Sequence, residues 1–280
     1  MDSESSSLLA NKLAELTESH QHVIPELAKG FSECGKYMTK DSAQEFLDGM
    51  IHARIGIRVM AEHFLSLQTC TKDWVGIVNT QVCPASLLKT MATYVSDICE
   101  LNYGMSPQVI INGHGDTTLA YVTVHLEYIF MELLKNAMRA TVEYGQKTGR
   151  TELPDLIISI AQGDQDVTIR IRDEGGGIAP SGALISISQL LDLHKVWEYS
   201  WTSVDKLDDD NDTVFSTQAR LSLQQSTGGP MAGLGFGLPM SRIYAKYFGG
   251  SLEIKSIPGH GCDVFLRIPN ISVVSNKVEI

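Results

Sequence analysis

Paired cysteines, long apolar runs and an excess of basic charge are all missing from this sequence. Its five cysteines are scattered and form no CxxC pair, which gives no support to a zinc site or a disulfide framework and fits a reducing compartment. No apolar run approaches the roughly 20 residues of a membrane-spanning helix, so no span is predicted. Lys and Arg number 22 against 33 Asp and Glu, and the net charge of -11 argues against binding to nucleic acid or anionic lipid.

What remains is the composition of an ordinary globular protein. A length of 280 residues allows one large domain or two ordinary ones, each able to bury its own core. The opening MDSESSS is acidic and serine-rich, so neither a secretory signal nor a cationic transit peptide is visible in this chain.

The first hundred residues carry helical patterns. SLLANKLAELTESH repeats leucines at helical spacing, and Pro25 is expected to kink or end that element. SAQEFLDGMIHARIGIRVMAEHFLSLQ opens with a capping box, Ser42 and Glu45, and stays apolar at three-and-four spacing. A third segment has Pro84 in its first turn and Gly104 just past its end. The pattern predicts three helices with no strand between them, which is a helical bundle.

After about residue 105 the pattern changes to alternating, β-branched strands with two helices among them, at 123–145 and 239–248. The predicted strands are 108–113, 155–161, 166–173, 251–257 and 262–268. This predicts an α+β protein of two domains, residues 1–105 and 106–280, the second with a mixed sheet and helices on one face. Residues 181–232 are rich in Ser, Thr, Asp, Gln and Gly, which is typical of a functional lid or a disordered insert.

The helix HLEYIFMELLKNAMRATVEYG carries a polar stripe. Tyr128, Glu132, Asn136, Arg139 and Glu143 follow one another at steps of four, four, three and four. Asparagine is a poor interior helix residue, and its amide oxygen suits Mg²⁺, which usually keeps waters and phosphate oxygens as other ligands. Glu132, one turn before it, is placed to deprotonate an attacking hydroxyl. The alternative is a solvated polar face.

The strand VTIRIRDEGGGI ends in a carboxylate followed by glycines. Val167, Ile169 and Ile171 share one face of the strand, and Asp173 continues that phase into the core. A buried carboxylate needs a donor, and an adenine amino group would serve. The alternative is an Asp that caps its own glycine turn.

The stretch GPMAGLGFGLPMSRIYAKYFGG places Gly233, Gly235 and Gly237 at the start of a helix that has Pro239 in its first turn. Glycine amides at a helix N-terminus bind anions, most often phosphates, although a plain loop has the same pattern. The stretch is neither a Walker loop nor a dinucleotide fingerprint. Taken with the polar helix, the Asp-glycine turn and the lid, it predicts a site for ATP and Mg²⁺.

At this point the chain resembles a known family. ELLKNAMRA, DEGGGI and GLGFGLPMSRIYAKYFGG are similar to the N, G1 and G2 boxes of the GHKL ATP-binding superfamily, whose domain is the Bergerat α/β sandwich with an ATP lid. KNAMRATVE, GFGLPMSR and FLDGMIHARIGIRVMAEHFLSL resemble the mitochondrial 2-oxoacid dehydrogenase kinases more closely. In that family the helical region is a four-helix bundle, which in this chain is expected to lack its first piece.

The resemblance implies roles for individual residues. Glu132 is the general base and Asn136 the Mg²⁺ ligand, while Asp173 accepts from the adenine amine beside Gly175 and Gly177. The further ATP contacts implied are Lys135, Arg139, Ser200, Gly233, Leu234, Gly235, Phe236, Gly237 and Leu238. Lys135 and Arg139 would add positive charge near the phosphates, which phosphoryl transfer needs.

The resemblance also implies a reaction and partners. The family transfers the γ-phosphoryl group of ATP to a serine on the E1α subunit of a 2-oxoacid dehydrogenase complex and so inactivates it. Tyr128, where pyruvate-type kinases have His, favours the branched-chain type over the pyruvate type. The implied partners are E1α, the lipoyl-bearing E2 core and a second copy in a homodimer, and the implied location is the mitochondrial matrix.

One departure and two alternatives belong beside this interpretation. Cys262 stands where the family has Thr, and a thiol is a weak hydrogen-bonding group, so weakened ATP binding is expected. One alternative is a histidine kinase with His52 or His63 as acceptor, although neither lies in the acceptor motif of that class. The other is an ATP-binding or scaffold module without transfer activity.

Overall fold

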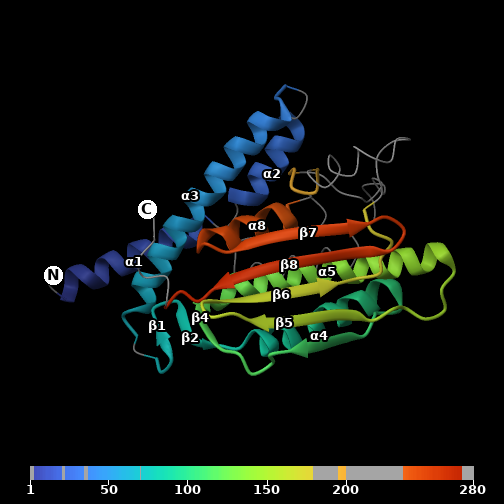
Figure 1. Cartoon of the computed structure of the whole chain (residues 1–280). Coiled ribbons are helices and arrows are strands. Elements are labelled where there is room, and N and C mark those ends of the chain that lie inside the picture. Colours follow the sequence, from blue (N-terminus) through green and yellow to red (C-terminus); the bar gives the residue numbers. More distant parts are fainter. Residues whose placement is uncertain are drawn as a thin grey trace.

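A computed structural model shows how these segments are arranged (Figure 1). The residues that it describes are 3–20, 23–34, 37–69, 71–178, 195–199 and 236–272. Helices from the N-terminal part lie at one end of a sandwich in which a sheet covers a layer of helices. Within the described residues, no helix has the length and apolar character needed to cross a membrane.

The N-terminal part contains three helices before the first strand: α1 (Ser3–Ser19), α2 (Val23–Cys34) and the long α3 (Lys40–Ser66). The expected break near Pro25 is present, but the chain breaks before the proline, which falls in the first turn of α2, where a missing N–H costs nothing.

The predicted capping box of α3 is wrong. The cap is Thr39, whose Oγ1 accepts from the backbone N–H of Ser42 at 3.3 Å, so the helix starts one turn earlier than the box implied. Asp41 in this extra turn lies where the helix dipole favours negative charge.

Three short strands form a small antiparallel sheet in the order β1-β2-β4: β1 (Trp74–Val75), β2 (Val78–Val82) and β4 (Leu119–Val122). The prediction that no strand separates the N-terminal helices is therefore wrong. The hairpin turns at Gly76, which has a positive φ of 57°. A two-residue strand is too short to show alternation, so the sequence pattern could not reveal it.

Helix α4 (Pro84–Tyr103) confirms the predicted start and stop signals, because Pro84 opens it and Gly104 ends it with φ 73°. The helix packs against α5 (Thr123–Thr148) beneath the main sheet (Figure 1). Helix α8 (Gly237–Tyr247) packs against both α5 and α3. The layer of helices thus has α5 at its centre.

The main sheet contains the five predicted strands, each within two residues of the expected bounds: β3 (Val109–Gly113), β5 (Leu156–Gln162), β6 (Asp166–Arg172), β7 (Ser251–Ile257) and β8 (Gly261–Pro269). Their order is β3-β5-β6-β8-β7, with β3 and β5 parallel and the other neighbours antiparallel, which confirms a mixed sheet. Helices α4, α5 and α8 cover one face.

The predicted inward face of β6 is confirmed, since Val167, Ile169 and Ile171 are buried. They belong to one hydrophobic cluster that continues through α5 and α4 to Leu47 of α3. Strand β2 also pairs with β4 across the boundary expected near residue 105. The division into two domains stays a prediction, and the elements on its two sides share one core.

Candidate functional site

The middle of α5 buries a pair of opposite charges. Glu132 is 4% exposed and Lys135 is 5% exposed, and Lys135 Nζ donates to Glu132 Oε1 at 2.5 Å. Removing a carboxylate from water is expensive unless an opposite charge compensates it. Glu132 therefore does not lie on a solvated polar face. Lys135, expected near phosphates, has its ammonium group on this carboxylate.

Asn136 lies next along α5, and its side chain is exposed. Among the described residues there is no group of three or more His, Cys, Asp or Glu side chains that could hold a metal ion. A magnesium ion at this place would take the amide oxygen of Asn136 as a protein ligand and complete its shell with phosphate oxygens and water, which is a donor set that suits it. The exposed amide fits that use.

The other members of the polar stripe serve different purposes. Arg139 Nε pairs with Glu143 Oε1 at 2.7 Å, and the hydroxyl of Tyr103 on α4 donates to the same oxygen at 3.0 Å. Burial together with Glu143 raises the pKa of Tyr103 to about 12, so the hydroxyl keeps its proton. Glu143 thus links α5 to α4 through Tyr103, and Arg139 pairs with the same carboxylate. Tyr128 is buried, and its hydroxyl has no hydrogen-bond partner within the described chain.

The first turn of α8 lies directly on the carboxylate of Glu132. A Cβ atom added to Gly237 would collide with Glu132 Oε2, so glycine is required by the close approach of this side chain. Phe236, just before it, is buried, and Leu238 is half-buried. The N-terminal end of a helix favours negative charge, so the carboxylate and the helix start stabilise each other. Gly233, Leu234, Gly235 and Ser200 lie outside the described residues, as does the predicted lid except for 195–199.

At the end of β6, Asp173 is 5% exposed, and no cation among the described residues lies beside it. Its Oδ1 accepts from the backbone N–H of Gly175 at 2.9 Å and of Cys262 at 3.2 Å. Burial raises the pKa of this carboxyl to about 6, against the effect of the two backbone hydrogen bonds. Asp173 thus caps its own glycine turn. Both of these bonds use Oδ1, and no described residue donates to Oδ2, which could therefore accept from a ligand.

The glycines after Asp173 let the turn fit between α5 and the sheet. A Cβ on Gly175 would lie 2.6 Å from the backbone of Ala140 in α5. Gly177 has φ 69°, and a Cβ there would lie 2.5 Å from the carbonyl oxygen of Ile257. Ala140 is two turns beyond Glu132, so α5 contacts both the Asp173 turn and the α8 start, about 12 Å apart along its axis. That separation is comparable with the length of an extended nucleotide.

Cys262 lies beside Asp173 on β8. It continues the phase of the buried Val264 and Leu266, as predicted, and is half-buried. Burial, with a smaller effect of Asp173, raises the pKa of the thiol to about 11, so the neutral thiol lines this corner. The nearby Ser256 hydroxyl accepts from the backbone N–H of Ile178 at 2.8 Å.

The β7–β8 turn is a part of the site that the sequence did not reveal. The N–H of Gly176 donates to the carbonyl of His260 at 3.1 Å, and the N–H of Gly259 donates to the carbonyl of Gly176 at 2.8 Å. A Cβ on Gly261 would collide with the carbonyl of Asp173. The string PGHG at the start of β8 indicates a turn, but it does not reveal that the turn contacts Gly176, more than 80 residues away.

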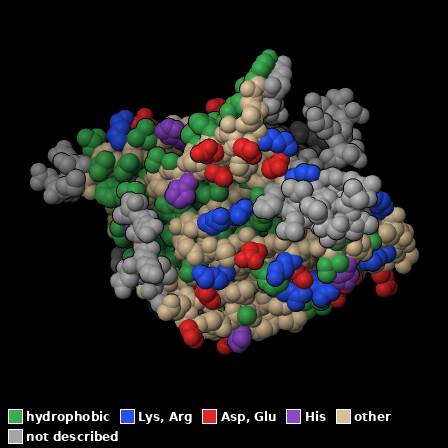
Figure 2. Space-filling model, turned by 45° about the horizontal axis from the view of Figure 1, so that its top comes forward, with side chains coloured by type: hydrophobic (Ala, Val, Ile, Leu, Met, Phe, Trp, Pro, Cys, Tyr) green, Lys and Arg blue, Asp and Glu red, His purple; other side chains and the backbone are tan. Residues whose placement is uncertain are grey.

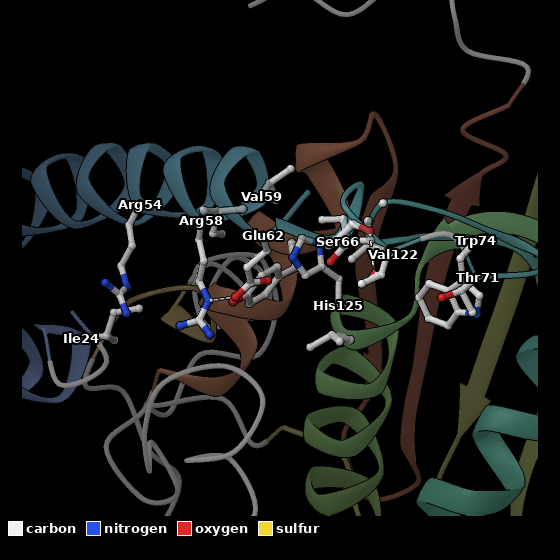
Figure 3. A pocket seen from close by; sticks show the side chains of 16 residues that line it. Ile24, Arg54, Arg58, Val59, Glu62, Ser66, Thr71, Trp74, Val122 and His125 are labelled. Carbon is white, nitrogen blue, oxygen red and sulfur yellow. Dashed lines mark hydrogen bonds and ion pairs between the residues drawn. The ribbon is translucent and has the colours of Figure 1, made fainter. Parts of the chain in front are cut away.

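A cavity of about 360 Å³ lies at the other end of α5, between α3, the β1–β2 hairpin and α8. Figure 3 shows Arg54, Arg58 and Glu62 in a row on α3, with an ion pair between Arg58 Nε and Glu62 Oε1 at 2.7 Å. Within the described residues, Arg54 Nη2, Arg58 Nη1 and His125 Nδ1 are buried without a hydrogen-bond partner. Burial lowers the pKa of His125 to about 3, so this imidazole is neutral.

Surface charge does not by itself attract a nucleotide. On the face in Figure 2, acidic and basic side chains are interspersed, in line with the net charge of -11. Any binding of an anion must therefore depend on local groups such as backbone amides, the Asn136 amide and a bound cation.

Comparisons with known proteins agree with these observations. Residues 121–271, more than half of the chain, match the model of the histidine kinase-, DNA gyrase B- and HSP90-like ATPases. Residues 2–79 match the model described as mitochondrial branched-chain alpha-ketoacid dehydrogenase kinase.

The chain is also similar to mitochondrial pyruvate dehydrogenase (acetyl-transferring) kinases. It is 34% identical to the enzyme of Arabidopsis thaliana over 258 residues, which cover 90% of this chain and 65% of the relative. It is 33% identical to that of Schizosaccharomyces pombe over 257 residues, which cover 89% of this chain and 56% of the relative. It is 29% identical to isozyme 1 of Mus musculus, over 91% of this chain and 57% of the relative. The chain therefore spans less than two thirds of the length of these relatives.

Proposed function

This chain belongs to the histidine kinase-, DNA gyrase B- and HSP90-like ATPase family, and on that premise we propose that it binds ATP with Mg²⁺ and phosphorylates a protein serine. The observation that carries the proposal is the position of α5. It meets the start of α8 at Glu132 and the Asp173 turn at Ala140, and Asn136 lies between these two contacts. Three segments far apart in the sequence thus meet along one helix.

Each residue has a role that follows from its surroundings. Asp173 Oδ2 accepts a hydrogen bond from the adenine amino group, and the backbone of Gly175 and Gly177 allows the adenine ring to approach closely. The start of α8 supplies backbone N–H groups for phosphate oxygens, and Asn136 holds Mg²⁺. Mg²⁺, when bound, offsets the negative charge of the phosphates.

Glu132 is the proposed general base. Its carboxylate takes the proton of the attacking serine hydroxyl as the oxygen forms its bond to the γ-phosphorus and the bond to the β-phosphate oxygen breaks. Lys135 holds the carboxylate in place and supplies an opposite charge that offsets the cost of burying it. The helix start at Gly237 brings the phosphates to the same place.

We propose the E1α subunit of a 2-oxoacid dehydrogenase complex as the substrate. The relatives are named as pyruvate dehydrogenase kinases, whereas residues 2–79 match the branched-chain kinase model and Tyr128 also favours that type. We therefore propose the branched-chain complex first, and inactivation of it as the outcome. A lipoyl-bearing E2 partner, a homodimer and a place in the mitochondrial matrix accompany this proposal, supported by the likeness to mitochondrial kinases.

The test is transfer of labelled phosphate from ATP to purified E1α of the branched-chain and pyruvate complexes. Acid-stable label on serine supports the proposal. Acid-labile label on the chain itself would indicate a histidine kinase, and binding without transfer would indicate a scaffold module.

Glu132→Gln tests the assignment of the base. Loss of a general base lowers the rate by roughly 10²–10⁴-fold, so we expect transfer to fall by that factor while Mg-ADP affinity stays within about threefold. Full transfer activity in this variant would contradict the assignment. Glu143→Gln, on the same helix but paired with Arg139, is the matched control.

A further inference from the structure

Residues 195–199, here called the strap, bind to α3. The hydroxyl of Tyr199 donates to Asp48 Oδ1 at 2.5 Å, and the amide of Gln44 donates to the carbonyl of Trp197 at 3.1 Å. The N–H of Tyr199 also donates to Gln44 Oε1 at 3.4 Å. The strap is thus held to one side of α3 by side chains one turn apart. It is the short orange segment near α3 and α8 in Figure 1.

The strap also contacts α8. The guanidinium of Arg242 lies over the ring of Trp197, 4.7 Å from its centroid. The rings of Tyr199 and Phe236 have their centroids 4.9 Å apart. Phe236 is the residue before Gly237, at the start of α8. Tyr199 therefore contacts α3 with its hydroxyl and the start of α8 with its ring.

The hydrogen bond between Tyr199 and Asp48 dominates this connection. The ion pair of Lys40 with Glu198 is weak in comparison, because the Lys40 side chain is 80% exposed. A hydrogen bond to a carboxylate in a half-buried place is stronger than a neutral one. Burial and Asp48 both raise the pKa of Tyr199, so its hydroxyl remains a donor.

Apolar packing does not replace these polar contacts. A cavity of about 260 Å³ lies between α3, Trp197 of the strap and α8, and polar side chains such as Gln44, Asp48 and Arg242 form part of its lining. The strap contacts therefore add to the direct packing of α8 against α3 and α5 in fixing the position of the α8 start.

We propose that Tyr199 is a positioning residue: by joining Asp48 of α3 to Phe236, it holds the first turn of α8 against the carboxylate of Glu132. The inference rests on the proposed function in one respect, that the start of α8 binds phosphates. The inference goes beyond the proposed function by connecting the N-terminal helices to the site. A change in the position of α3 is then transmitted to the phosphate end of the site through one side chain.

The experiment compares Tyr199→Phe with Tyr247→Phe in the full chain. Tyr199→Phe keeps the ring on Phe236 and removes the hydroxyl from Asp48. Tyr247 is the matched control, because it also lies between α8 and α3, where its ring contacts His52 at a centroid distance of 5.2 Å. We expect Tyr199→Phe to lower Mg-ADP affinity and kcat by about tenfold, the effect of one lost hydrogen bond to a charged group, with KM for E1α unchanged. Tyr247→Phe is expected to match the parent.

A double variant tests the connection to Asp48. Asp48→Ala removes the acceptor and should lower Mg-ADP affinity and kcat at least as much as Tyr199→Phe, and the two substitutions together should cost no more than Asp48→Ala alone, since the Tyr199 bond is then already broken. Additive losses, or unchanged affinity and kcat in Tyr199→Phe, would overturn the inference. A lowered melting temperature with unchanged kinetics would overturn it as well, because the bond would then be structural alone.

Hydrogen exchange separates this inference from the proposed function. In the protein without nucleotide, Met240 N donates to the carbonyl of Phe236 at 3.0 Å in the first turn of α8. We expect this amide to exchange about tenfold faster in Tyr199→Phe than in Tyr247→Phe. Faster exchange without any Mg-ADP binding by the parent would support the strap and contradict the proposed function. Equal exchange in the two variants would overturn the strap.

Discussion

Glu132 and Asp173 are two carboxylates of nearly equal burial, 4% and 5% exposed, at two ends of the proposed nucleotide site. Glu132 has the ammonium group of Lys135 on one oxygen and the start of α8 against the other. Asp173 accepts from two backbone N–H groups, has no cation beside it within the part of the chain that the structure describes, and has its pKa raised to about 6. The groups that contact a buried carboxylate, and not its burial alone, therefore decide what it can do.

The difference corresponds to two kinds of chemistry. A base for phosphoryl transfer must be ionised when the hydroxyl attacks, and a neighbouring cation favours that form. An acceptor for an adenine amino group needs a lone pair at a fixed place, and the two backbone N–H groups on Oδ1 hold the carboxyl group so that Oδ2 offers one. Glycine serves both ends, by leaving room for the Glu132 carboxylate at Gly237 and for the backbone of α5 at Gly175.

Removing Lys135 tests whether this cation stabilises the buried carboxylate of Glu132. Lys135→Met leaves a buried carboxylate without its cation, so we expect the free energy of unfolding to fall by about 3–5 kcal/mol. Denaturant unfolding measures this, and the double variant Glu132→Gln with Lys135→Met should recover most of the loss. If Lys135→Met were as stable as the double variant, the pair would not compensate the buried charge.

Replacing Asp173 tests the other end through pH. Because its folded pKa of about 6 lies above the unfolded value of 3.8, the fold favours the protonated form, so its contribution is most favourable below about pH 4 and is lost as pH rises through 6. Relative to Asp173→Asn, the parent should lose about 1 kcal/mol between pH 5 and pH 7.5. Unfolding at both pH values checks this. Parallel pH profiles would contradict the raised pKa.

A substitution of Cys262 is expected to have a smaller effect, on nucleotide affinity at the Asp173 end. Its thiol lies beside Asp173, where a hydroxyl would be a stronger donor and acceptor. We expect Cys262→Thr to raise Mg-ADP affinity by about threefold without changing kcat, measured by titration calorimetry. Cys34→Thr, at an exposed position, is the control. Equal affinity in parent and Cys262→Thr would remove the thiol as a cause of weaker binding.

Local sequence patterns predicted much of the fold and the inward position of Asp173. Alternation along β6 placed Asp173 inward with Ile169 and Ile171, because side chains on a strand follow a period of two whatever the partners are. The start and stop signals of α4 were equally reliable. The hairpin at Gly76 was missed, because its first strand, β1, has two residues and is too short to show alternation. The N-cap of α3 was also wrong, since it is Thr39 and not Ser42.

The Glu132 end was harder to predict because its contacts are long-range. The family resemblance implied that Lys135 lies near the phosphates, whereas the structure shows its ammonium group paired with Glu132. No local pattern relates Glu132 to Gly237, over 100 residues away, or Tyr199 to Asp48, 151 residues apart. The type of each residue was informative, whereas its partner depended on how the segments pack together.

The most direct test of the account is titration of the folded chain with ADP in magnesium buffer by calorimetry, with circular dichroism as the control for folding. The account predicts saturable binding of one nucleotide per chain that requires magnesium and is weakened by Asp173→Asn. The absence of any binding heat from well-folded protein, with and without magnesium, would contradict the nucleotide site on which every role assigned here depends.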